Sequence, residues 1–185
     1  MKTIHLSQVA RAAALCVGAV LFTGAAHAAG DKNAYDQART TSKATYETAS
    51  KQCDSLSGNA KDICVAEAKA ARTKADVQAE AAYKNTPKAR ENAIHESAEA
   101  DYKVAKERCD DKAGNDKDVC MKEAKAAETR AKADAKATKK SSEARADASK
   151  DKREADYKVA AEKCDAMSGD AKDGCVKQAK ARYGM

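Results

Sequence analysis

The sequence predicts an all-α protein made of three tandem antiparallel helical hairpins, each stapled by one disulfide near its turn. One segment recurs three times, and each copy carries two cysteines at the same spacing. Ala, Lys, Glu and Arg, which are strong helix formers, dominate the composition. Leu, Ile, Val and Phe make up only about 6% of residues 29–185, far below the roughly 20% of a usual globular core. We therefore expect coiled-coil-like packing through alanine-rich seams, closed by the cysteines.

The repeat has the pattern Y-x6-C-D-x3-G-x2-K-D-x-C-x2-[EQ]-A-K-A. Its three copies start at Tyr46, Tyr102 and Tyr157 and align without gaps, 56 and then 55 residues apart. A repeat period in this range indicates that each copy is one supersecondary unit. The Tyr is the one large side chain of each seam, and we interpret it as a packing residue.

Each copy is predicted to fold as helix, tight turn and helix. A glycine is placed as the left-handed residue that ends the first helix, and the following Asn or Asp as the N-cap of the second. An Asp three residues after that cap suits the N3 position and the positive end of the helix. The three sets are Gly58, Asn59 and Asp62; Gly114, Asn115 and Asp118; and Gly169, Asp170 and Asp173. The Asp after each first cysteine is attributed to turn chemistry.

The position of the cysteines around the glycine predicts their pairing. One cysteine lies five residues before the glycine and the other six after it, so the two face each other in a short-turned hairpin. The predicted disulfides are Cys53–Cys64, Cys109–Cys120 and Cys164–Cys175. The alternative is one continuous helix, in which positions 11 apart also share a face. The glycine and the caps between the cysteines favour the hairpin.

The hairpins are assigned to residues 29–86, 87–140 and 141–185. At the first boundary one helix is predicted to end and the next to begin, with Thr86 as N-cap and Pro87 in the first helical position. The second boundary, at Ser141-Ser142, contains neither Gly nor Pro. Two alternatives stay open there: a turn, or a helix of about 50 residues that runs through it.

Residues 1–28 are predicted to be a secretory signal peptide. Lys2 and Arg11 precede an apolar run over 12–26. Ala26-His27-Ala28 at its end matches a cleavage signature. The run is shorter than the roughly 20 residues that span a bilayer, so we expect no transmembrane anchor after cleavage. Cys16 leaves with this segment, and six cysteines remain. An even number suits disulfides in the oxidising periplasm, where we place the protein.

No motif in the sequence predicts catalysis. We find no nucleophile motif, no phosphate-binding glycine loop and no paired carboxylates outside the turns, so we predict a protein without enzyme activity. We predict no catalytic residues, no metal ligands and no cofactor. Cysteine spacing differs from that of zinc sites, and His95 is the only histidine after residue 28. Interleaved charges of both signs are typical of a solvated helix surface, and no nucleic acid is expected as a partner.

We expect a structural, scaffold or stress-related role in the cell envelope, with envelope proteins as candidate partners. The alternative is a binding protein. Its ligand would be an anionic envelope polymer held by lysine-rich faces such as residues 132–140, or a metal ion held by cysteine thiolates.

The Ala/Lys/Glu/Asp-rich stretch at 123–136 resembles the long helical middle domain of TolA-like cell-envelope proteins. This compositional resemblance extends over most of residues 29–185, and it implies long helices in the envelope. The chain departs from that family's pattern by its cleavable signal, its three cysteine pairs and the absence of an evident C-terminal globular domain. A TolA role is therefore not implied.

Overall fold

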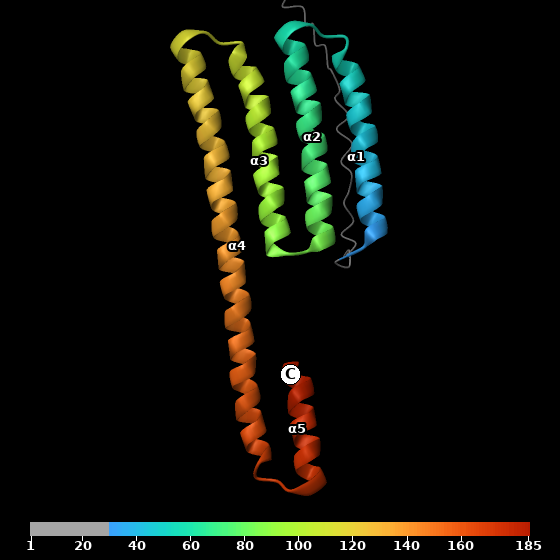
Figure 1. The fold of residues 1–185 in the computed structure, drawn as a ribbon, viewed down its shortest axis with the longest axis vertical. Helices are drawn as coiled ribbons and strands as arrows, with labels where there is room; N and C mark the ends of the chain where they lie inside the picture. The colour runs from blue at the N-terminus through green and yellow to red at the C-terminus, as the bar shows by residue number, and fades with distance from the viewer. Residues whose placement is uncertain (1–29) are drawn as a thin grey trace, which may run out of the picture.

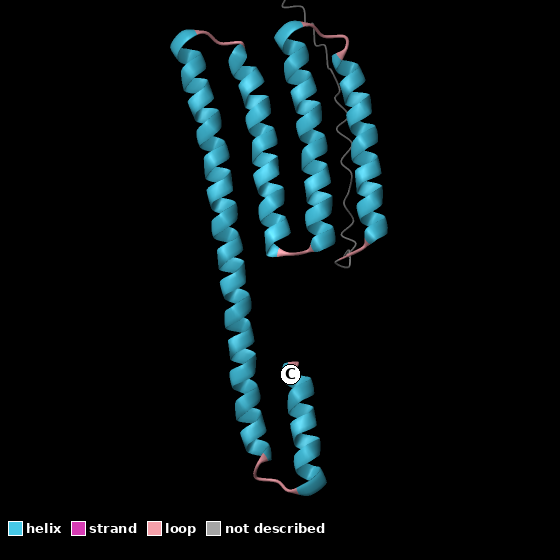
Figure 2. Ribbon diagram, in the orientation of Figure 1, coloured by secondary structure: helices cyan, strands magenta, loops and turns pink. Residues whose placement is uncertain are grey.

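The computed structural model describes residues 30–185; the predicted signal peptide with Cys16 lies outside this range. Five helices account for most of it: α1 (Lys32–Cys53), α2 (Gly58–Lys84), α3 (Pro87–Asp110), α4 (Gly114–Cys164) and α5 (Gly169–Tyr183). Short turns join them, as Figure 2 shows. The predicted all-α hairpin fold is confirmed.

The helices form a single layer. Among the described residues each helix packs only against its neighbours in the chain: α1 on α2, α2 on α3, α3 on α4, and α4 on α5. Helices α1 to α3 lie side by side along one half of α4 (Figure 1). Helix α5 lies beside the other half of α4, on the same side as α3. The two stapled turns of the first two hairpins are therefore at one end of the layer, and the third is at the opposite end.

Local capping accounts for the start of α1 and for the junction between α2 and α3. The Asp31 carboxylate accepts hydrogen bonds from the backbone N–H groups of Asn33 and Ala34, at 2.9 and 3.1 Å, at the start of α1. Asn85 ends α2 in a left-handed conformation with φ of 44°. The Thr86 hydroxyl then accepts from the Ala89 N–H at 3.1 Å, directly before Pro87. The predicted helix end and helix start at this junction are confirmed.

Helix α4 runs without a break through Ser141-Ser142. Its 51 residues correspond to about 76 Å at 1.5 Å per residue. Of the two alternatives at this junction, the continuous helix is the one observed. The residues around the serines contain no helix breaker, so nothing in the local sequence ends the helix. The boundary assigned at 140/141 therefore falls inside a helix that the second and third hairpins share.

The apolar core is thin. Ala70, Ala100 and Val104 form its one cluster of buried residues among those described, with Ala66 packed against it. Every buried apolar residue in the described range is Ala, Val or Cys, and the largest fully buried side chains are Cys53, Cys109 and Cys164. Since apolar burial stabilises by about 25 cal/mol per Å², alanine seams contribute little. Disulfides and polar contacts across the seams are therefore prominent features of this fold.

Candidate functional site

The three disulfides are the feature that all copies of the repeat share. Cys53–Cys64, Cys109–Cys120 and Cys164–Cys175 are bonded, with Cα–Cα distances of 5.6, 5.7 and 5.7 Å. These distances lie in the usual range for disulfides. The predicted pairing within copies is confirmed. Each bond ties the end of one helix to the second turn of the next, and the first cysteine of each pair is fully buried.

The turn glycines have the predicted left-handed conformation but a different place in the turn. Their φ values are +55°, +54° and +55° at Gly58, Gly114 and Gly169. Each is the first residue of the second helix, whereas we predicted the residue that ends the first. The first helices end earlier, at Cys53, Asp110 and Cys164. This prediction is wrong because the chain leaves the helix just after the cysteine, and the glycine orients the start of the next helix.

The predicted caps are also wrong. The N-cap residues are Ser57, Ala113 and Ser168, and none makes a side-chain capping hydrogen bond. Because the helices begin two residues earlier than predicted, the assigned N-caps lie inside them as second residues; these are Asn59, Asn115 and Asp170. For the same reason the predicted N3 carboxylates fall at the fifth helical position, where they are exposed; these are Asp62, Asp118 and Asp173.

Asn59 instead joins the first hairpin to the second. Its Nδ2 donates to the backbone oxygen of Glu107 at 2.9 Å and to Asp111 Oδ1 at 2.5 Å. Both acceptors belong to the end of α3 and the residue that caps it. The residue predicted to cap its own helix therefore holds the neighbouring helix.

An ion pair crosses each stapled turn in the same way. It joins the Asp after the first cysteine to the Lys three residues after the glycine. The pairs are Asp54–Lys61 at 3.0 Å, Asp110–Lys117 at 2.7 Å and Asp165–Lys172 at 2.9 Å. The hydrogen bond to Asp165 raises the pKa of Lys172. We did not predict this pairing from the sequence, although both residues recur at fixed places in the repeat pattern.

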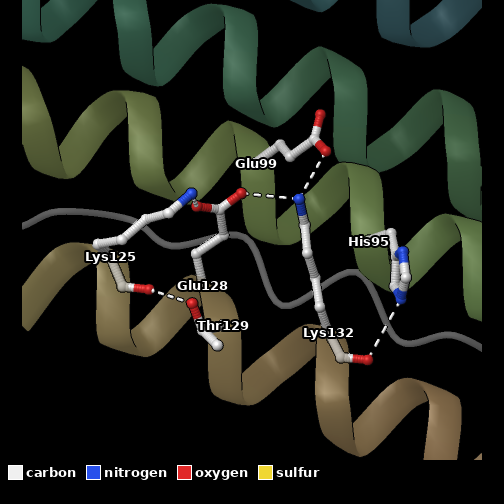
Figure 3. Close-up of polar contacts among 6 residues, drawn as sticks. All are labelled: His95, Glu99, Lys125, Glu128, Thr129 and Lys132. Atoms are coloured by element: carbon white, nitrogen blue, oxygen red, sulfur yellow. Dashed lines mark hydrogen bonds and ion pairs between the residues drawn. The ribbon is translucent and has the colours of Figure 1, made fainter.

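The seam between α3 and α4 contains a buried carboxylate. Glu128 lies between two lysines, with its oxygens 2.7 Å from Lys125 Nζ and 2.7 Å from Lys132 Nζ (Figure 3). Lys132 also bonds Glu99 of α3 at 2.6 Å. The hydrogen bond from Lys125, and next that from Lys132, lower the pKa of Glu128, and the hydrogen bond from Lys132 lowers the pKa of Glu99. His95 belongs to the same group, with Nε2 3.2 Å from the Lys132 carbonyl oxygen.

A second buried carboxylate lies further along the same seam. Glu91 Oε2 is 2.8 Å from Lys88 Nζ in its own helix and 3.5 Å from Lys139 Nζ in α4. The hydrogen bond from Lys88 lowers the pKa of Glu91. With the Lys132–Glu99 pair, this makes two points along α3 and α4 where oppositely charged side chains pair across the seam. Such contacts fix the register of two helices that bury little apolar surface against each other.

The seam between α1 and α2 has a polar contact of another kind. The buried Ser42 hydroxyl donates a hydrogen bond to Asp76. Asp76 also lies 3.6 Å from Arg72 and 3.9 Å from Arg39. The α1–α2 and α3–α4 seams therefore each have their own set of polar partners, and a helix shifted along its neighbour would lose them.

Two shallow grooves follow the helices of the first two hairpins. The groove between α1 and α2 has a volume of about 650 Å³ and is lined mainly by alanines, with Arg72 as its one charged lining residue. The charged lining of the groove between α2 and α3, of about 730 Å³, consists of four basic side chains and five carboxylates. Tyr46 borders both grooves, with the Arg72 guanidinium 5.4 Å from its ring centroid.

Metal ligation and membrane insertion are two further functions that residues 30–185 could serve. This range contains no group of three or more His, Cys, Asp or Glu side chains placed to hold a metal ion. None of its helices is long and apolar enough to cross a bilayer. No family model, curated protein or solved structure matches the chain. The function proposed below is therefore inferred from the sequence and from the geometry of residues 30–185.

Proposed function

We propose that this chain is a non-enzymatic structural protein of the cell envelope, exported to the periplasm, where it acts as a rigid helical spacer or scaffold. The observation that carries this proposal is α4, whose 51 residues join a stapled turn at one end of the layer to a stapled turn at the other. Residues 143–153 of α4 are exposed throughout. A single helix that bridges two stapled ends sets a fixed distance of about 76 Å between them.

The disulfides support the proposed location. Such bonds persist in oxidising compartments and are rare in reducing ones. Three closed pairs in a chain with a thin alanine core suit a protein that folds after export. Export also agrees with the signal peptide predicted at residues 1–28.

Hydrogen exchange tests the spacer directly. We expect amides of residues 143–153 to exchange more slowly than an unstructured peptide, since a spacer needs this segment to stay helical. Ala146→Pro should remove that protection while leaving the stapled ends protected, because proline costs about 3 kcal/mol inside a helix. Ala146→Leu is the matched control and should keep protection. Unstructured exchange rates in the wild-type segment would exclude a rigid spacer, and recovery of the protein in the cytoplasmic fraction would exclude an envelope role.

A second candidate is binding of an anionic envelope polymer. Residues 30–110 hold 14 basic and 14 acidic side chains, whereas residues 111–140 hold 9 basic and 6 acidic. Lipopolysaccharide binding that weakens with salt would support this function. Lys136→Glu with Lys140→Glu should abolish it, and Lys32→Glu with Lys43→Glu in the neutral part should not. Retention of binding in the first variant would refute it.

Metal binding through thiolates fits the structure less well. All six cysteines of the described residues are paired in disulfides, and a disulfide must be reduced before its sulfurs can ligate as thiolates. Thiol titration of the purified protein decides this: free thiols in the oxidised protein would revive the metal alternative.

A further inference from the structure

The contact between α2 and α3 shows how one hairpin of this chain stacks on the next. Ala66 and Ala70 of α2 pack with Ala100 and Val104 of α3. Polar pairs flank this cluster: Arg108 bonds Glu67 at 2.5 Å, Lys74 pairs with Asp101, and Asn59 bonds the Glu107 carbonyl oxygen. The stacking surface is thus a small-residue strip with matched polar groups along it.

The same two surfaces occur elsewhere in the chain without a partner helix. The repeat places α5 in correspondence with α2, and α1 with α3. In the described residues α5 packs only on α4, and α1 only on α2. On α5 the corresponding residues are Asp170, Gly174, Lys177, Gln178 and Ala181, which we call the α5 strip. On α1 they are Gln37, Thr40, Ala44, Glu47, Thr48, Lys51 and Gln52, which we call the α1 strip. All of them are exposed.

We propose that a second copy of this chain covers these surfaces. The α5 strip of each copy packs antiparallel against the α1 strip of the other, as α2 packs on α3, and the two copies form a twofold-symmetric dimer. The occupant of each strip is therefore the other strip, on a different chain.

The charges on the two strips are complementary. In the α2–α3 contact Asn59 lies against the backbone of Glu107; the corresponding residues are Asp170 and Lys51, which carry opposite charges. Ala66 and Lys103 border one groove in that contact, and their counterparts Lys177 and Glu47 are again opposite in charge. The ion pair Glu67–Arg108 becomes two neutral amides, Gln178 and Gln52. In each of these three pairs both residues differ from their counterparts in the α2–α3 contact, and no pair brings two like charges together.

The lengths of the helices also fit. Helix α3 has 24 residues, about 36 Å, and so leaves about 40 Å of α4 on that side, partly occupied by α5. Helices α1 and α2, with 22 and 27 residues, are about 33 and 40 Å long. The free space beside α5 in the plane of the layer (Figure 1) therefore has the length of the first hairpin.

A half-turn about an axis normal to the layer makes this contact twice. It places the first hairpin of the second copy beside α5, with the strips antiparallel, and brings the second copy's α5 beside α1 of the first. Because the operation closes on itself, the contact produces a dimer and no open filament.

Charge reversal across the strips tests the dimer. Sedimentation velocity of the mature, oxidised chain should show a particle of twice the chain mass. Lys177→Glu should raise the dimer dissociation constant at least tenfold, because a carboxylate at position 177 would then face Glu47, and adding Glu47→Lys to the same chain should restore it. Lys140→Glu, an equal charge change on an exposed part of α4, is the control and should leave the constant unchanged. Circular dichroism checks that each variant keeps its helices.

Zero-length carbodiimide cross-linking locates the contact. In a mixture of unlabelled and nitrogen-15 chains, we expect amide links between Lys177 and Glu47 that join a light to a heavy peptide. A chain that sediments only as a monomer from micromolar to millimolar concentration would overturn the proposal. So would a dimer that Lys177→Glu leaves intact, or one that Glu47→Lys does not rescue. None of these outcomes bears on the spacer proposal, which the exchange of residues 143–153 decides separately.

Discussion

At each stapled turn, a cysteine pair, a left-handed glycine and an Asp–Lys ion pair occupy the same relative positions in all three copies. The disulfide fixes the two helices together, the glycine allows the chain to enter the second helix, and the ion pair crosses the turn between them. The backbone at the glycine has a conformation that L-residues with a Cβ adopt only at a cost. The glycine is therefore needed for its conformation, because its position leaves open space for a side chain.

We expect Gly58→Ala, Gly114→Ala and Gly169→Ala each to lower the free energy of unfolding by roughly 1 kcal/mol, through backbone strain alone. Gly174 is the matched control. It lies within α5, has no positive φ and is likewise surrounded by open space. Gly174→Ala should raise stability by about 0.5–1 kcal/mol, because alanine is the better helix former. Urea unfolding measures both changes. Equal effects at Gly174 and the turn glycines would contradict this account of the turn.

The lysine-paired carboxylates of the α3–α4 seam predict how stability depends on pH; Glu91 and Glu128 are buried, and Glu99 is exposed. Hydrogen bonds from lysines lower the pKa values of Glu91, Glu99 and Glu128 below their usual 4.5 in the folded chain. A lowered folded-state pKa gives stability that is fully present above the unfolded-state pKa and is lost as pH falls through the folded-state pKa. The melting temperature should therefore decline below about pH 5 and keep declining through the lowered pKa values.

Glu128→Gln identifies the contribution of this group. The variant should melt lower than wild type at neutral pH, because Lys125 and Lys132 lose their anionic partner. Its melting temperature should also fall less steeply on acidification. Glu143→Gln, at an exposed position of α4, is the control. Parallel pH curves for wild type and Glu128→Gln would show that this carboxylate does not contribute to acid sensitivity.

At the scale of helices, the repeat pattern and the cysteine spacing were enough to predict the hairpins, their disulfides and the junction at Thr86-Pro87. They did not predict the turn in detail, because placing a helix start to within two residues depends on where the chain leaves the preceding helix. The α3–α4 contacts were beyond reach for another reason. Lys132 and Glu99 are 33 residues apart, and no local periodicity relates them. Ser141-Ser142 stayed ambiguous because the absence of a breaker permits a helix without requiring one.

Helix α5 should depend on its disulfide more than any other helix. It has 15 residues and, within the described part of one chain, packs only on α4, whereas α2 and α3 each pack on two neighbours. Replacing Cys164 and Cys175 by Ser removes a loop constraint worth roughly 3 kcal/mol. We expect α5 to lose its amide protection in hydrogen exchange while the first two hairpins keep theirs. Replacing Cys109 and Cys120 should leave most protection of α3 in place, since α2 still holds it. Equal loss in both variants would contradict neighbour-by-neighbour packing.

The whole molecule is a one-layer array in which stability is passed between neighbours. Repeat proteins of this kind behave approximately as a sum of unit and interface terms. Here the units have unusually little core, and the α1–α2, α2–α3 and α3–α4 interfaces combine small side chains with polar contacts specific to each seam. The disulfides are the feature that all three units share, and each of them closes one hairpin on itself within a single copy of the repeat.

Non-reducing peptide mapping of the mature protein tests this claim most directly. Trypsin can cleave after Lys61, Lys117 and Lys172, each of which lies between the two cysteines of one copy. We expect three linked peptide pairs: 52–61 with 62–69, 109–112 with 118–122, and 164–172 with 173–177. Alkylation before digestion should label no cysteine. A linked pair that joins cysteines of different copies, or a labelled cysteine in the oxidised protein, would contradict three separately stapled hairpins.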